Sequence, residues 1–196
     1  KPGLESDAEI IELTSRLFDS LLLKDITIDI NHRNLVESFI NQTFDSKDTV
    51  LVSDMLRAID KIQKKSKQDI LNEFKDRYDE SKLEKILEFS QIKGNILEVE
   101  SKIDTTNLKS WDELKQLFSS LENRGVANTR INFGIVRGLD YYSGMVFEVF
   151  DKNSKLGALA GGGRYDSLTK AFGRDDIGAA GVAGGVERII LTMQEQ

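Results

Sequence analysis

The spacing of hydrophobic residues changes twice along the chain. Residues 7–23 carry apolar side chains three and four positions apart behind a Ser-Asp-Ala-Glu start, which predicts a capped helix. Residues 26–31 alternate between β-branched and polar side chains, which predicts a strand. From 32 to 124 the strand signals vanish and apolar residues again follow helical spacing. From 125 onward the chain returns to strand-like runs and holds most of the glycines.

These two changes predict one α+β domain that is interrupted by an insertion. We expect the segments 1–31 and 125–196 to build one mixed, mainly antiparallel sheet with flanking helices. The segment 32–124 is expected to form a separate, mostly helical lobe whose apolar stripes are its core. No strand of the sheet is expected between residues 40 and 120. After residue 125 the pattern predicts strands near 128–136, 145–150, 156–160 and 179–183, and helices near 165–172 and 185–193.

The composition excludes several classes of function. The chain of 196 residues has no cysteine and one histidine, His32, which excludes disulfide frameworks, thiolate metal sites and histidine-rich metal sites. We expect no metal held by protein side chains, and a Ser/His or Cys/His triad is disfavoured. The apolar runs are too short to cross a bilayer and no basic-then-apolar leader is present, which predicts a cytoplasmic protein. The net charge of −6 does not favour binding of polyanions such as nucleic acids. A local lysine cluster at 61–67 could still form a basic patch that binds them.

The most distinctive stretch, 136–142, reads Val-Arg-Gly-Leu-Asp-Tyr-Tyr between two predicted strands. On an unbroken strand Arg137 shares a face with Tyr141 while Tyr142 points to the other face, and Gly138 can bend the strand. A bidentate donor beside phenols suits an anionic or carboxylate-bearing small molecule. The same residues fit an edge strand with solvated polar groups, and chemistry alone leaves both interpretations open.

Two glycine-rich stretches follow. Gly161, Gly162 and Gly163 are predicted between a strand and a helix, where a ligand can approach the backbone and a helix N-terminus favours an anion. Their spacing fits neither a dinucleotide fingerprint nor a Walker loop, and a tight turn explains them equally well. The Arg-Tyr-Asp sequence that follows, centred on Tyr165, adds hydrogen-bonding groups.

The second glycine-rich stretch, 181–188, places small residues where a predicted strand meets a helix. Gly185 and its neighbours would allow a flat ligand to lie against the strand. Arg188, in the first turn of the helix, could stack on a nucleobase or pair with a phosphate. A close strand–helix crossing, with Arg188 paired to an acid, is the alternative.

Together and in this order, the three stretches resemble signatures of the histidyl-tRNA synthetases, a family of class II aminoacyl-tRNA synthetases. Residues 136–142 resemble the RGLDYY signature, 160–166 the second histidine-specific signature, and 181–188 motif 3. Weaker similarities extend the resemblance over nearly the whole chain: 7–11 resembles the segment after motif 2, 26–34 the strand leading to the insertion, and 57–61 an insertion-domain stretch of the archaeal and eukaryotic branch.

The resemblance implies a class II fold and ATP-dependent ligation of histidine to its tRNA through histidyl-adenylate, with Mg²⁺ accompanying ATP. Arg137 matches the arginine that contacts the α-phosphate during adenylate formation, doing electrostatic work that other class II enzymes give to a metal ion. The other implied roles are histidine binding for Tyr141, Tyr142 and Tyr165, ATP binding for Arg188 and Gly185, and the floor of the site for Gly161, Gly162 and Gly163.

The sequence also departs from the family pattern. Motif 1, motif 2, the glutamates of the histidine pocket that precede Asp7, and an anticodon-binding domain are not found. We therefore expect this chain to be the second half of a catalytic domain with its insertion, from a parent that is a homodimer. Histidine, ATP and histidine tRNA are the expected partners of the parent, and the chain alone is expected to be inactive.

Two other functions remain open. A non-ligating paralogue, such as the histidine-sensing regulatory subunit of ATP phosphoribosyltransferase, is expected to lose the arginine and parts of the tyrosine signature. Arg137, Tyr141 and Tyr142 are all present, which favours the ligase. The helical segment could also be an autonomous interaction module, which its nearly balanced charge neither supports nor excludes.

Overall fold

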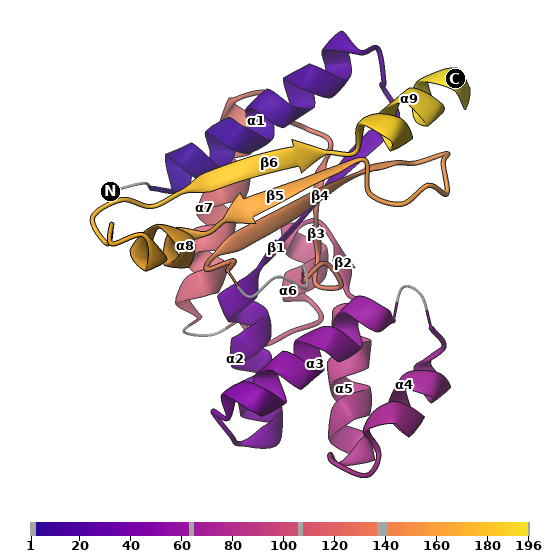
Figure 1. Ribbon diagram of the computed structural model, residues 1–196, viewed down its shortest axis with the longest axis vertical. Helices are drawn as coiled ribbons and strands as arrows, with labels where there is room; N and C mark the ends of the chain where they lie inside the picture. Colours follow the sequence, from indigo (N-terminus) through magenta and orange to yellow (C-terminus); the bar gives the residue numbers. More distant parts are fainter. Residues whose placement is uncertain (1–2, 63–64, 106–107, 137–140, 196) are drawn as a thin grey trace.

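A six-stranded mixed sheet organises the molecule (Figure 1). The computed structural model describes residues 3–62, 65–105, 108–136 and 141–195. The strand order is β2-β3-β1-β4-β5-β6, in which β1 and β3 run parallel and every other neighbouring pair is antiparallel. The strands are β1 (Ile26–His32), β2 (Lys93–Gly94), β3 (Thr129–Asn132), β4 (Met145–Asp151), β5 (Ala160–Arg164) and β6 (Ala180–Gly184). The predicted α+β class with a mainly antiparallel sheet is confirmed.

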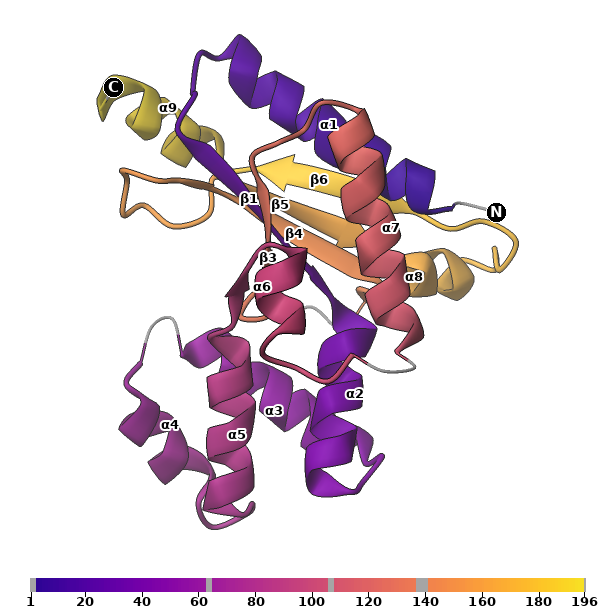
Figure 2. The ribbon, with the colours of Figure 1, turned by 180° about the vertical axis from the view of Figure 1, so that it is seen from behind.

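Helices α1 (Leu4–Ser20) and α7 (Lys109–Asn123) cover one face of this sheet, which we call the covered face. Figure 1 shows α7 behind the sheet and α1 along its β6 side, and in Figure 2 α7 lies in front of the sheet. Alternate strand residues point toward these helices and are fully buried, among them Ile28, Ile30 and Phe147. Helices α8 (Asp166–Ala171) and α9 (Val186–Glu195) each follow a strand, β5 and β6 respectively.

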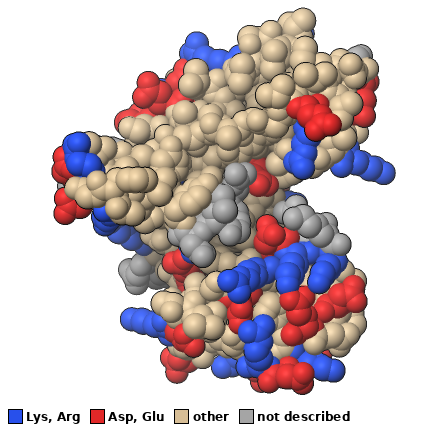
Figure 3. Space-filling view, viewed as in Figure 1, with Lys and Arg blue, Asp and Glu red and all other residues tan. Residues whose placement is uncertain are grey.

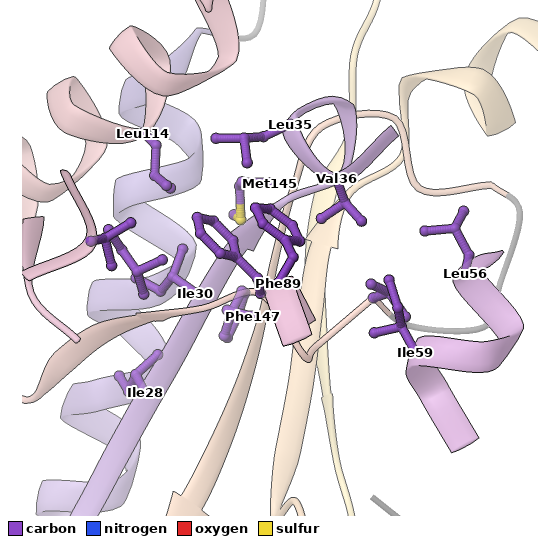
Figure 4. Packing of buried hydrophobic residues seen from close by; sticks show 14 of the residues in the cluster. Ile28, Ile30, Leu35, Val36, Leu56, Ile59, Phe89, Leu114, Met145 and Phe147 are labelled. Carbon is purple, nitrogen blue, oxygen red and sulfur yellow. The ribbon is translucent and has the colours of Figure 1, made fainter. Parts of the chain in front are cut away.

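The remaining helices α2–α5 form a lobe beside the sheet (Figure 1). Their bounds are α2 (Arg33–Phe44), α3 (Thr49–Lys61), α4 (Lys67–Phe74) and α5 (Glu80–Ser90), and the short α6 (Ile96–Glu100) follows β2. An aromatic stack connects the lobe to the sheet, because the ring of Phe89 lies 3.9 Å from that of Phe39 and 4.5 Å from that of Phe133, centroid to centroid. Figure 4 shows Phe89 between the sheet residues Ile30 and Phe147 and the lobe residues Val36 and Ile59.

The expectation that no strand of the sheet lies between residues 40 and 120 is wrong. Strand β2 pairs antiparallel with β3, with Lys93 opposite Asn132. Two residues are too few for a period-two pattern, so the sequence carries no signal for this strand. Helix α7, within the same segment, packs on α1 and β1 rather than extending the helical lobe.

The glycine triplet also lies elsewhere than expected. Gly161, Gly162 and Gly163 form the interior of β5 instead of a turn between a strand and a helix. Glycine is disfavoured inside strands in general, but a Cβ at Gly162 would collide with the Gly181 carbonyl and approach the Phe147 ring to 2.9 Å. Close packing against neighbouring strands therefore overrides the local propensity.

Candidate functional site

The second face of the sheet, which we call the open face, carries the polar and small strand residues. In register across five strands lie Arg130, Asp29, Glu148, Gly161 and Ala183. Figure 3 shows this side of the molecule: few charged residues lie over β4–β6, whereas the helical lobe carries mixed acidic and basic side chains. Charge on the open face thus concentrates toward β1 and β3, and small residues concentrate toward β5 and β6.

Three tyrosines gather at one end of β5, and we call them the tyrosine cluster. Tyr141 and Tyr142 precede β4, and Tyr165 follows β5. The ring centroid of Tyr142 lies 4.7 Å from that of Tyr141 and 6.4 Å from that of Tyr165, and the Tyr141–Tyr165 distance is 6.1 Å. Tyr142 is buried and Tyr141 is exposed. The structure therefore brings together all three tyrosines that the sequence predicted for one pocket.

The rings of the tyrosine cluster rest directly on glycines of the sheet. A Cβ at Gly163 would lie 2.9 Å from the Tyr142 ring, and a Cβ at Gly181 would collide with the Tyr165 hydroxyl. Only glycine permits this approach without displacing a ring. Gly181 and Gly163 are paired across β5 and β6, so together they make a flat floor beneath two of the tyrosines.

A carboxylate network that the sequence reading missed lies on the same open face. Asp29 is buried and accepts two hydrogen bonds from Arg130, at 2.6 and 3.1 Å, and one from Asn132 at 2.5 Å. The hydrogen bond to Asp29 raises the pKa of Arg130 above its usual range, so this guanidinium stays charged. Glu148 lies opposite Asp29 on β4. The available signal was an acidic residue in the middle of each of two predicted strands.

Arg188 lies at the far end of the same two strands. It belongs to the first turn of α9, and its Nη1 donates a hydrogen bond of 2.8 Å to the carbonyl of Ala158. Ala160 pairs with Gly184 at this end, whereas Arg164 pairs with Ala180 beside the tyrosine cluster. Four residues of strand separate the two ends, which is about 13 Å at roughly 3.3 Å per residue. Arg188 and the tyrosine cluster are thus not in contact.

Of two other predicted site residues, the structure describes Gly185 but not Arg137. Gly185 donates its N–H to the Leu159 carbonyl at 2.8 Å, and a Cβ there would meet only ordinary contacts. Arg137 lies outside the described residues, so its predicted convergence with Tyr142, Tyr165 and Arg188 stays a prediction. The segment leading to it is held on the open face by Asn31, whose side-chain amide donates to the carbonyl of Ile135 at 2.9 Å.

A cavity of about 420 Å³ lies on the covered face, behind the tyrosine cluster. Its charged or titratable lining residues are Asp7, His32, Glu113, Arg164 and Asp166. Burial raises the pKa of Asp7 to about 6, and it does so against the opposing effect of Arg164. Burial also lowers the pKa of His32, whose Nε2 lies 3.2 Å from a Glu113 oxygen, so this histidine is neutral near neutral pH.

Two classes of feature are absent from the described part of the chain. No cluster of three or more His, Asp or Glu side chains there is arranged to hold a metal ion. No helix in those residues is both long and apolar enough to cross a membrane.

A family model described as "Histidyl-tRNA synthetase" matches residues 1–189. A histidine–tRNA ligase of Pyrococcus horikoshii is 37% identical over 97% of this chain and 45% of its own length, and one of Cytophaga hutchinsonii is 32% identical over 98% and 44%. The chain therefore spans less than half the length of these relatives. Because both organisms supply relatives of similar identity, assignment to the archaeal and eukaryotic branch stays a prediction.

Solved structures agree on the fold. A histidyl-tRNA synthetase from Nostoc sp. PCC 7120 superposes with a TM-score of 0.86 at 25% identity, covering 100% of this chain and 48% of that one. A Bacillus halodurans protein titled as an ATP phosphoribosyltransferase regulatory subunit/histidyl-tRNA synthetase gives a TM-score of 0.79 at 18% identity, covering 98% and 51%. The second likeness supports the fold alone.

Proposed function

Because this chain belongs to the histidyl-tRNA synthetase family, we propose that the full-length protein carrying it joins histidine to its tRNA through a histidyl-adenylate. The observation that carries the proposal is the family match over residues 1–189. The tyrosine cluster on its glycine floor adds support, since it lies within the two stretches that first indicated a histidine pocket.

The tyrosine cluster is the proposed pocket for the amino acid. Histidine has an imidazole with two ring nitrogens, one a donor and the other an acceptor in the neutral form. A phenol can serve either nitrogen, because its hydroxyl both donates and accepts. The rings of Tyr142 and Tyr165 lie directly on Gly163 and Gly181, so the glycines hold both phenols close to the sheet.

ATP is proposed to lie along β5 and β6, between the tyrosine cluster and Arg188. The separation of about 13 Å between these ends suits an extended ligand, and the intervening open-face residues Gly161, Gly163 and Ala183 are all small. Arg137 is the proposed contact for the α-phosphate, and Arg188 with Gly185 would serve the other end. Mg²⁺ fits as a companion of ATP held mainly by phosphate oxygens and water, as is usual for this ion.

The division of the chain into domains is also a proposal. The segments 1–31 and 125–196 would form the catalytic part and 32–124 the insertion, within which the lobe of α2–α5 is the distinct body and β2 and α7 belong with the sheet. By analogy with the family, we infer a homodimer that works in the cytoplasm, where charged tRNA is used.

One alternative is a non-ligating regulatory paralogue. The Bacillus halodurans protein is described as such a subunit or a histidyl-tRNA synthetase, but at 18% identity its likeness supports the fold alone and favours neither function. The gathering of Tyr141, Tyr142 and Tyr165 in one cluster fits both functions, since a histidine sensor also needs the pocket but does not need the residues that act on ATP. Arg137 and Arg188 are the residues that separate the two functions.

The test is histidine-dependent exchange of pyrophosphate into ATP by the full-length protein. We expect exchange with histidine and none with the other amino acids, and charging of histidine tRNA in a second assay. A protein that binds histidine in calorimetry yet neither exchanges pyrophosphate nor charges tRNA would contradict the ligase and favour the sensor.

A further inference from the structure

The end of β5 sends neighbouring side chains to opposite faces of the sheet. Tyr165 joins the tyrosine cluster on the open face, while Arg164 enters the cavity on the covered face. Successive strand residues alternate in this way by geometry alone. The segment 164–166 therefore connects the proposed histidine pocket to a charged cluster on the other side of the sheet.

On the covered face Arg164 is held mainly by Asp7 of α1. Its Nε donates to Asp7 Oδ2 at 3.0 Å, and its Nη2 lies 2.8 Å from Oδ1 in an ion-pair contact that is not an aligned hydrogen bond. The same guanidinium donates to the Gly3 carbonyl at 2.9 Å and lies 3.3 Å from Asp166. Asp7 and Arg164 are both more than nine-tenths buried, so their pairing is shielded from water.

The backbone of the same segment fixes the loops that carry the tyrosines. The Arg164 carbonyl accepts a 2.9 Å hydrogen bond from the N–H of Ser143, directly after Tyr142. The Asp166 N–H donates to the Ser143 hydroxyl at 2.8 Å, and the Tyr165 N–H donates to the Ala179 carbonyl at 2.8 Å. A shift of Arg164 toward or away from α1 would therefore move two tyrosine-bearing loops and the start of β6 together.

We propose that the ion pair between Asp7 and Arg164 positions Tyr142 and Tyr165 for the amino-acid substrate from the opposite face of the sheet. This inference rests on the proposed function. Both residues are positioning residues, because neither faces the tyrosine cluster. A buried ion pair is a weak source of stability compared with an apolar pair of the same volume, whereas its geometry fixes one arrangement. A role in holding the tyrosines of the pocket in position therefore fits this pair better than a role in stabilising the fold.

The test compares the substitution Asp7→Asn with Asp176→Asn in the full-length protein. Asp176 forms an exposed ion pair with Arg174, 2.8 Å apart, in the loop between α8 and β6, so it controls for loss of one carboxylate near the site. In pyrophosphate exchange we expect Asp7→Asn to raise KM for histidine about tenfold and to leave KM for ATP within about twofold, since small displacements of positioning groups cost rate and affinity steeply. Asp7→Glu should recover most of the loss, and Asp176→Asn should behave as the native protein.

Solution pH supplies a second readout. The groups facing Asp7 are Arg164 from β5, Asp166 from α8, Glu113 from α7 and His32 from β1. Because the pKa of Asp7 is raised to about 6, its carboxylate is charged at pH 7.5 and partly neutral at pH 5.5. The ratio of histidine KM between Asp7→Asn and native protein should therefore fall by about half or more between those pH values, and titration of histidine itself cancels in the ratio.

The outcomes separate the two proposals. Equal histidine KM for the native and Asp7→Asn proteins, or equal losses for histidine, ATP and tRNA with a lower Tm, would overturn the positioning role. Absence of exchange in the native protein would overturn the proposed function alone. In that case a crystal structure of the Asp7→Asn protein still decides the inference, because a Tyr165 ring that has moved from Gly181 supports it and an unmoved ring contradicts it.

Discussion

On the covered face the strands present Ile28, Ile30 and Phe147, all fully buried under α1 and α7, whereas on the open face the same strands present Asp29, Glu148 and glycines. Apolar burial of the first kind is the main favourable term in folding. The open face buries fewer apolar side chains and instead carries polar groups and glycines, which let tyrosine rings lie close to the backbone. The comparison indicates that substitutions on the covered face should act on stability and those on the open face on chemistry.

The largest expected effect is on stability. Phe147→Ala should lower the free energy of unfolding by about 3–5 kcal/mol, because it empties a fully buried site in the core. Urea denaturation of the full-length protein would measure the loss. Phe150→Ala is the matched control on the open face of the same strand, where the ring is only partly buried, and it should cost about 1 kcal/mol. Equal losses would contradict the difference between the faces.

Arg137→Ala should act on the reaction and spare the fold. If this arginine meets the α-phosphate, its loss should raise the barrier to adenylate formation by about 3 kcal/mol, which is roughly a hundredfold or more in rate. Pre-steady-state measurement of adenylate formation gives the rate, and thermal unfolding should show little change. Weaker binding of histidine with an unchanged rate would argue against this role.

Gly163→Ala tests the floor of the open face. The added methyl group would lie 2.5 Å from the Met145 carbonyl oxygen and 2.9 Å from the Tyr142 ring. We therefore expect β4 and the ring to shift and KM for histidine to rise about tenfold, with a stability cost of about 1–3 kcal/mol. Gly3→Ala adds a methyl group with no neighbour within 4 Å and serves as the control. A native histidine KM in the Gly163→Ala protein would show that the ring does not require this floor.

The smallest expected effect is on the pH dependence of stability, and it arises from His32 on the covered face. Burial holds the pKa of His32 below 6.5, so below that pH the unfolded chain binds a proton that the folded chain does not, and stability falls as pH falls. Between pH 7.5 and 5.5 the His32→Asn protein should lose on the order of 1 kcal/mol less than the native protein in urea denaturation. Asp7→Asn controls for the opposite trend of Asp7, whose raised pKa stabilises the fold as pH falls from about 6 toward 4. Identical pH slopes for the native and His32→Asn proteins would contradict the buried, neutral histidine.

Motifs and long periodic segments were readable from the sequence. The family resemblance, which rests on motifs, is confirmed. The α+β class is confirmed as well, because strong helices and strands are determined by local apolar spacing. Asp29 and Glu148 were visible only as acids in the middle of two predicted strands. Nothing in the local pattern says that they face each other on one side of the sheet.

The tertiary structure alone decided three things: the pairing of β2 with β3, the place of Gly161–Gly163 inside β5, and the ion pair between Asp7 and Arg164. Each depends on contacts between residues far apart in the chain, and the last joins positions separated by 157 residues. Spacing in a sequence records which face of its own element a side chain occupies. Which other element that face meets is settled only when the whole sheet and its helices pack together.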